Sequence, residues 1–89
     1  MNSGKSEVSV PKPIFNLVQR VVADALEIDL DSVHFDSLVI DFPDWDSLGF
    51  IKIILGLSDK FITEIDAERL VDCESVEQIC AYLTTIVSS

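Results

Sequence analysis

The sequence predicts an all-α fold: a four-helix bundle with three main helices, a short third helix and a long first loop. Three observations predict it. Apolar residues recur at helical spacing in three segments, no segment sustains the alternation of a half-buried strand, and 89 residues suffice for one domain. We expect residues 1–12 to form a flexible N-terminal tail and residues 13–89 to form the domain.

The first helix is predicted to have Pro13 in its first turn. Its apolar residues fall on one stripe at helical period: Ile14, Leu17, Val18, Val21, Val22, Ala25 and Leu26. Pro13 suits a first turn, because the N–H that proline lacks would have no helical partner there. We expect the helix to end between Glu27 and Leu30.

Residues 31–46 are predicted to form a long structured loop, because they keep no helical period and contain Pro43. Four apolar side chains are expected to pin this loop onto the helices: Phe35, Leu38, Ile40 and Phe42. A structured connection of this length in so small a domain usually serves a function.

The second helix is predicted from Ser47 to about Ile62, with Asp46 as its N-cap. One stripe is assigned to the core: Phe50, Ile53, Ile54, Leu57 and Phe61. A second line either widens the core face or docks partner proteins: Leu48, Ile51 and Leu55. Gly56 either permits a close contact between helices or is simply tolerated.

A short third helix is predicted over residues 66–71 with Asp66 as its cap, and a fourth helix begins after Ser75. Ser75 and Gln78 fit the S-x-x-Q capping box. The fourth helix carries one apolar stripe: Val76, Ile79, Cys80, Leu83, Ile86 and Val87.

Composition argues against several classes of function. The formal net charge of −10 disfavours nucleic acid and anionic lipid as partners, because both attract clustered Lys and Arg. Cys73 and Cys80 are too few for a disulfide scaffold, and with His34 as the sole histidine they form no zinc pattern. Residues 1–13 lack the apolar core of a secretory signal, and no apolar run is long enough to span a bilayer. We therefore expect a cytoplasmic protein without a metal site.

Ser47 is the candidate functional residue. In the run Asp46-Ser47-Leu48 it stands where a loop meets a helix, with its hydroxyl beside the unpaired N–H groups of the first turn. These groups and the helix dipole favour a phosphate on this serine by about 0.3–1 kcal/mol. Asp46 adds little to this effect, because its like charge repels phosphate. No general base accompanies the serine, so nothing predicts catalysis by the chain itself.

The run from Asp44 to Gly49, Asp-Trp-Asp-Ser-Leu-Gly, resembles the acyl carrier proteins, and the likeness extends over roughly residues 13–87. It implies an acyl-carrier-like fold and 4′-phosphopantetheine transferred from coenzyme A to Ser47, with Asp46 and Leu48 completing the attachment motif. The terminal thiol of that arm would hold an acyl or aminoacyl group as a thioester.

The resemblance also implies the partners. They are a phosphopantetheinyl transferase, a ligase that loads the acyl or aminoacyl group, and a downstream acyltransferase or synthase. The protein would be a substrate of these enzymes rather than an enzyme, and we expect it to be a monomer.

A second D-S-L run, Asp36-Ser37-Leu38, provides an internal comparison. Pro43 prevents a long helix from growing after it, so this serine is expected to lie in a loop or turn. The modification is therefore assigned to Ser47.

The charge pattern departs from many carriers of fatty acid synthesis, which have an acid directly after D-S-L and several acids along the second helix. Here Gly49 follows Leu48, and most acids lie in residues 27–46 and 64–77. This form is more similar to carriers dedicated to specialised, polysaccharide or aminoacyl pathways. Partners are expected to meet an apolar second helix with acidic flanks. The expected partner-binding residues are Asp44, Trp45, Leu48, Ile51, Leu55 and Glu68. Trp45 has a second interpretation, as an anchor of the loop.

Two alternative functions stay open. An unmodified acidic helical adaptor would explain the helices but not an exposed serine at a helix start. An EF-hand-like calcium module would use Asp44, Asp46 and Gly49 as positions 1, 3 and 6 of its loop. However, Leu48 and Leu55 stand at positions 5 and 12, where calcium requires oxygen ligands.

Overall fold

The computed structural model describes residues 11–88, with side chains described to residue 87. Over this range the elements are α1 (Lys12–Leu26), η1 (Leu30–Ser32), η2 (Val39–Asp41), α2 (Ser47–Phe61), α3 (Ala67–Val71) and α4 (Val76–Ser88). The elements η1 and η2 are single 3-10 turns, and one isolated antiparallel bridge joins Leu38 to Ser75. The predicted all-α bundle with its short third helix is confirmed. Of the expected tail, residues 1–10 lie outside the described residues, and Lys12 already belongs to α1.

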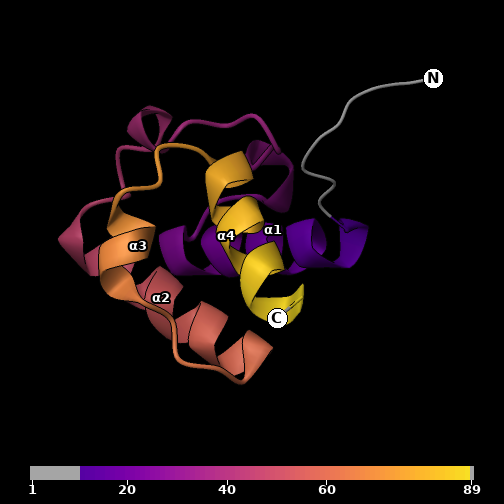
Figure 1. The fold of residues 1–89 in the computed structure, drawn as a ribbon. Coiled ribbons are helices and arrows are strands. Elements are labelled where there is room, and N and C mark those ends of the chain that lie inside the picture. The colour runs from indigo at the N-terminus through magenta and orange to yellow at the C-terminus, as the bar shows by residue number, and fades with distance from the viewer. Residues whose placement is uncertain (1–10, 89) are drawn as a thin grey trace.

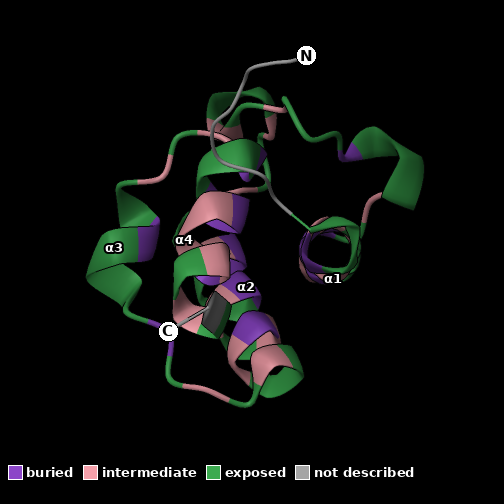
Figure 2. Ribbon diagram, turned by 45° about the vertical axis from the view of Figure 1, so that its right-hand side comes forward, coloured by how far each residue is buried: buried purple, intermediate pink, exposed green. Residues whose placement is uncertain are grey.

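The helices enclose one apolar core. α1 packs against both α2 and α4, and α3 packs against α4 (Figure 1). Figure 2 shows the buried residues on the inward sides of the long helices, whereas α3 is mostly exposed. The largest fully buried side chains come from the predicted stripes and from one loop position: Val18, Val22, Val33, Ile53, Leu57, Val76, Ile79, Cys80 and Leu83. None of the described helices is long and apolar enough to cross a membrane.

α1 ends at Leu26, one residue before the predicted range of Glu27 to Leu30. Glu27 adopts the left-handed conformation with φ 57°, which turns the chain out of the helix. The N–H of Ile28 then donates to the carbonyl of Ala23 at 3.0 Å, which satisfies one of the helix's last carbonyls.

The first loop is held differently from the prediction. Phe42 is half-buried against the core, and Phe35 makes an edge-to-face contact with Phe15, but Ile40 is 86% exposed and Leu38 is also exposed. The expectation was wrong for these last two residues. Ile40 lies in η2, a 3-10 turn whose three residues point in three directions, so that only one can face the bundle; Leu38 lies directly before this turn.

The main anchors of the loop are Val33 and Gln19. Val33 is fully buried, and the side-chain amide of Gln19 donates to the carbonyls of Leu30 and Val33 at 3.1 and 2.9 Å. Farther along, the N–H of Val39 donates to the carbonyl of Glu74 at 2.9 Å. The first loop is therefore tied both to α1 and to the segment between α3 and α4.

α2 separates into two faces. Ile53 and Leu57 are fully buried, and the rest of the predicted core stripe, Phe50, Ile54 and Phe61, is half-buried against the core. The second line of the helix is exposed, at 61% for Leu48, 51% for Ile51 and 65% for Leu55. This line therefore does not widen the core face. We refer to these three residues as the ridge.

A close contact between α1 and α2 occurs at Gly56. A Cβ atom on this residue would lie only 2.8 Å from Val21 Cγ1. The interpretation of Gly56 as a residue that permits close packing is thus confirmed.

The predicted caps of α3 and α4 form. The Asp66 carboxylate accepts the N–H of Glu68 at 3.0 Å, and the Ser75 hydroxyl accepts the N–H of Gln78 at 3.2 Å. The Gln78 side chain accepts the N–H of Glu74 at 2.7 Å, one residue earlier than in the standard capping box.

Replacing Leu57 with Ala is expected to lower the free energy of unfolding by about 2–5 kcal/mol, because the side chain is fully buried and its loss leaves a cavity. Leu55→Ala is the matched control on the same helix, and its largely exposed side chain predicts a change within about 0.5 kcal/mol. Urea unfolding of both variants checks this. Equal losses would contradict the assignment of the two faces.

The Cys80 thiol is expected to be inert towards alkylating reagents in the folded protein. Burial, and to a smaller extent the charge of Glu77, raise the pKa of this thiol to about 12, and the side chain is fully buried. Since the thiolate is the reactive form, Cys80 should react only after unfolding. The half-buried Cys73 should react sooner in the native protein, although burial raises its pKa as well. Mass spectrometry after timed alkylation measures both rates, and simultaneous labelling would refute the prediction.

Candidate functional site

Ser47 is the first residue of α2 and is exposed. The helix begins here because Asp46 caps it: the Asp46 carboxylate accepts the N–H of Gly49 at 2.9 Å. The carbonyl of Asp46 also accepts the N–H of Phe50 at 2.8 Å, the first α-helical bond of α2. The predicted position of the serine at a loop-to-helix junction is confirmed.

The surroundings of the Ser47 hydroxyl suit an anionic group. This hydroxyl makes no hydrogen bond to any described residue. Because Asp46 takes the N–H of Gly49, the N–H groups of Ser47 and Leu48 are the ones left free in the first turn. Together with the helix dipole, they favour negative charge at this end of α2.

Residues 42–46, which we name the strap, lead into the helix. The N–H of Trp45 donates to the carbonyl of Phe42 at 3.0 Å, and the two rings lie 5.7 Å apart. Both side chains are half-buried against the core. Trp45 is thus an anchor of the loop, in agreement with the simpler of its two interpretations.

The strap lies directly on the first turn of α2. A Cβ atom on Gly49 would overlap the carbonyl oxygen of Asp44 and would lie 2.9 Å from Leu26 Cδ2. Sequence reasoning treated this glycine as a departure from the family pattern and as a position of the EF-hand alternative, and it missed the contact. A buried glycine in the first turn of an apolar helix was the available signal.

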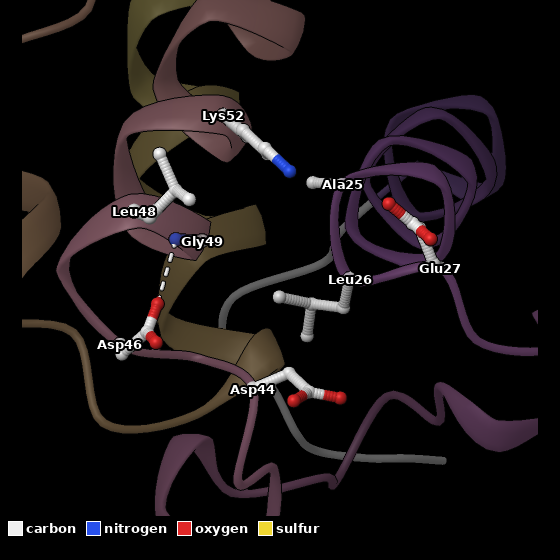
Figure 3. A pocket seen from close by; sticks show the side chains of 8 residues that line it. All are labelled: Ala25, Leu26, Glu27, Asp44, Asp46, Leu48, Gly49 and Lys52. Atoms are coloured by element: carbon white, nitrogen blue, oxygen red, sulfur yellow. Dashed lines mark hydrogen bonds between the residues drawn. The ribbon is translucent and has the colours of Figure 1, made fainter.

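An acidic hollow lies between the end of α1 and the start of α2 (Figure 3). Its lining comprises Ala25, Leu26, Glu27, Asp44, Asp46, Leu48, Gly49 and Lys52. The structure thus brings together three of the predicted site residues, Asp44, Asp46 and Leu48. In Figure 3 the Lys52 side chain points across the hollow towards Ala25 and Glu27 at the end of α1.

An apolar groove lies beside Ser47. Its volume is about 280 Å³, and it is lined by Val39, Trp45, Asp46, Ser47, Phe50, Leu70, Val71 and Cys73. A second groove of about 480 Å³ shares Val39, Val71 and Cys73 with the first and extends past Leu38 and Ile40. The sequence did not reveal Val71 or Cys73 at the site, because Val71 ends a five-residue helix and Cys73 lies just after it, a stretch too short to show a period.

Ser37, the serine of the other D-S-L run, stabilises a turn of the first loop. The hydroxyl of Ser37 accepts the N–H of His34 at 2.9 Å, and its carbonyl accepts the N–H of Val76 at 2.9 Å. It is half-buried in a turn, as expected from Pro43 downstream. His34, the sole histidine of the sequence, lines neither the acidic hollow nor the apolar groove.

The residues expected to bind partners are only partly gathered. The ridge runs along α2 from Leu48, the neighbour of Ser47, to Leu55. Glu68 is exposed on α3 and lines neither the acidic hollow nor the apolar groove. The site therefore has one exposed serine, an apolar ridge, an apolar groove and an acidic hollow.

The EF-hand alternative is wrong. Its 12-residue loop would begin at Asp44, so positions 4 to 12 would fall in α2, where the backbone is helical from Ser47 to Phe61. Asp46 is engaged as a helix cap. Within residues 11–87, no group of three or more His, Cys, Asp or Glu side chains is arranged to hold a metal ion.

This chain is similar in sequence to a known protein family. The family model described as "Phosphopantetheine attachment site" matches residues 16–83. The acyl carrier protein of Campylobacter jejuni subsp. doylei is 42% identical over 65 residues, which are 70% of this chain and 84% of the relative. That of Campylobacter lari is 39% identical over 66 residues, 71% of this chain and 86% of the relative. That of Lactobacillus acidophilus is 30% identical over 70 residues, 79% of this chain and 88% of the relative.

The family match covers all four helices of the bundle in part or in full, including the junction at the start of α2. The cofactor that it implies is covalently attached 4′-phosphopantetheine. With identities of 30–42% over most of both chains, this chain belongs to the acyl carrier protein family.

Proposed function

We propose that Ser47 is the attachment site of 4′-phosphopantetheine and that the protein presents an acyl or aminoacyl group to partner enzymes. The observation that carries this proposal is the contrast between the two D-S-L serines. Ser47 has an exposed, unengaged hydroxyl at the start of a 15-residue helix, whereas the hydroxyl of Ser37 is used inside a turn. When attached, the arm supplies a terminal thiol that holds the cargo as a thioester.

The residues present fit such an arm. The free N–H groups of Ser47 and Leu48 and the dipole of α2 favour the phosphate at the point of attachment. The apolar groove beginning at Ser47 offers a surface along which an extended chain can lie. Asp46 is held by its bond to Gly49, so the carboxylate stays beside the serine without occupying its hydroxyl.

The ridge is the proposed docking surface for partner enzymes. Exposed apolar side chains gathered on one face of a small protein usually mark an interaction site. The ridge begins next to Ser47, and we propose that exposed acidic residues of the strap and of α3, among them Asp44 and Glu68, also contribute to partner binding. A partner surface that is apolar at its centre and basic at its rim would complement this pattern.

The partners proposed are a phosphopantetheinyl transferase, a loading ligase and a downstream acyltransferase or synthase, with the carrier as their substrate. We also propose a monomer in the cytoplasm. A net charge of −10 opposes association between copies, and the two cysteines are free thiols.

Incubation with coenzyme A and a broad-specificity phosphopantetheinyl transferase should raise the intact mass by one arm. Ser47→Ala should abolish this gain and leave the free energy of unfolding within about 0.5 kcal/mol of wild type, because the hydroxyl is exposed and unengaged. Peptide mapping locates the added mass.

Ser37→Ala is the matched control and should behave in the opposite way. It removes the acceptor of the His34 N–H and should cost about 0.5–1.5 kcal/mol of stability while the mass gain persists. Loss of the mass gain in Ser37→Ala alone would overturn the choice of serine. No gain in wild type with several transferases would favour the unmodified adaptor.

Ile51→Gln should lower kcat/KM for the transferase by about tenfold, corresponding to one buried contact of about 1.4 kcal/mol in the complex. Stability should change little, because Ile51 is half-exposed in the free protein. Ile62→Gln is the control, since Ile62 is 90% exposed at the opposite end of α2 and outside the ridge. Steady-state kinetics on both variants checks the assignment, which fails if the two changes have equal effects.

A further inference from the structure

We propose that Gly49 is a positioning residue for the modification of Ser47: its missing side chain lets the backbone of Asp44 rest on the first turn of α2, and this contact fixes where the serine is presented. The inference rests on the proposed function, and it goes beyond the identification of the attachment residue.

The geometry leaves no room for a side chain at residue 49. A Cβ atom there would overlap a backbone carbonyl oxygen, that of Asp44, and would also lie 2.9 Å from Leu26 Cδ2. A leucine methyl can move by rotation of its side chain, but a backbone oxygen moves only with the chain that carries it. A larger residue therefore has to displace the strap.

The strap can move in few ways without moving Ser47. Upstream of Asp44, Pro43 has a restricted φ and Phe42 packs against the core. Downstream, Trp45 is bonded back to Phe42 and is half-buried, so the two aromatic anchors hold the strap from both sides. The remaining freedom lies at Asp46 and Ser47, where the chain enters the helix.

The N-cap bond of α2 also links the strap to the first turn of the helix. The N–H of Gly49 is the donor to the Asp46 carboxylate, so the residue that supports Asp44 also holds the residue that precedes Ser47. A shift of the strap strains this bond and moves the Ser47 hydroxyl together with the last residues of the strap.

The transfer itself requires accurate placement. The bond from Ser47 Oγ to phosphorus forms as the bond between the two phosphates of coenzyme A breaks. Adenosine 3′,5′-bisphosphate leaves with the bonding electron pair, and the serine proton passes to a base of the transferase. A displacement of about 1 Å at the reacting oxygen can cost about a hundredfold in rate.

Gly56 supplies the matched control. It is also a glycine of α2 that faces α1, and a Cβ atom there would lie 2.8 Å from Val21 Cγ1, the end of a side chain. Gly56→Ala therefore crowds the same pair of helices without touching the strap.

The experiment measures transferase kinetics of full-length wild type, Gly49→Ala and Gly56→Ala with coenzyme A, well below their unfolding temperatures. In Gly49→Ala we expect kcat to fall by about ten- to a hundredfold while KM stays within about twofold, because the ridge still docks and only the serine is displaced. The emission of Trp45, the sole tryptophan, should shift in this variant. Gly56→Ala should leave kcat, KM and emission unchanged.

Equal kinetic losses in the two variants, or unchanged kcat in Gly49→Ala, would overturn the proposal. If Gly49→Ala does not fold, the double variant Leu26→Ala/Gly49→Ala removes the side-chain overlap and keeps the backbone overlap, with Leu26→Ala as its reference. The double variant should then show the fall in kcat, and wild-type kinetics in it would refute the role of Gly49. Failure of wild type to accept the arm would instead refute the proposed function.

Discussion

The hydrogen bond from the Gly49 N–H to the Asp46 carboxylate decides where α2 begins, and the arrangement of the site depends on it. An N-cap of this kind typically contributes about 1 kcal/mol, which is small beside the burial of the core. Its importance is positional. Because the helix starts at Ser47 and not one turn earlier or later, the serine has its hydroxyl in solvent, and the ridge begins with the next residue.

α2 has to satisfy two demands with one sequence. Ile53 and Leu57 bury their side chains in the common core, where α2 packs against α1, and this burial provides the main attachment of the helix to the bundle. The ridge exposes three large apolar side chains of the same helix to water, at a cost in solubility that the acidic surface offsets. A formal charge of −10 opposes association between copies, which in the proposed function leaves the ridge available for a different, less acidic surface.

Hydrogen bonds between segments distant in sequence bring loop residues to the site. Val39 bonds to Glu74, which carries the first loop to the end of α3 and places Val71 and Cys73 along the apolar groove that starts at Ser47. Beside this bond, the carbonyl of Ser37 accepts the N–H of Val76. The two D-S-L runs are identical in residue type but differ in structure, because one leads into a helix and the other into a pairing between loops.

Much of this protein was determined by the sequence alone. The helix boundaries, the caps at Asp46 and Asp66 and the exposed position of Ser47 follow from residues within one or two turns of each other, and such local patterns are readable in one chain. Only the tertiary structure decided that Val33 is buried while Ile40 is exposed, and that Asp44 lies on Gly49. These are contacts between segments that meet only after folding, and a contact of that kind leaves no period in the sequence.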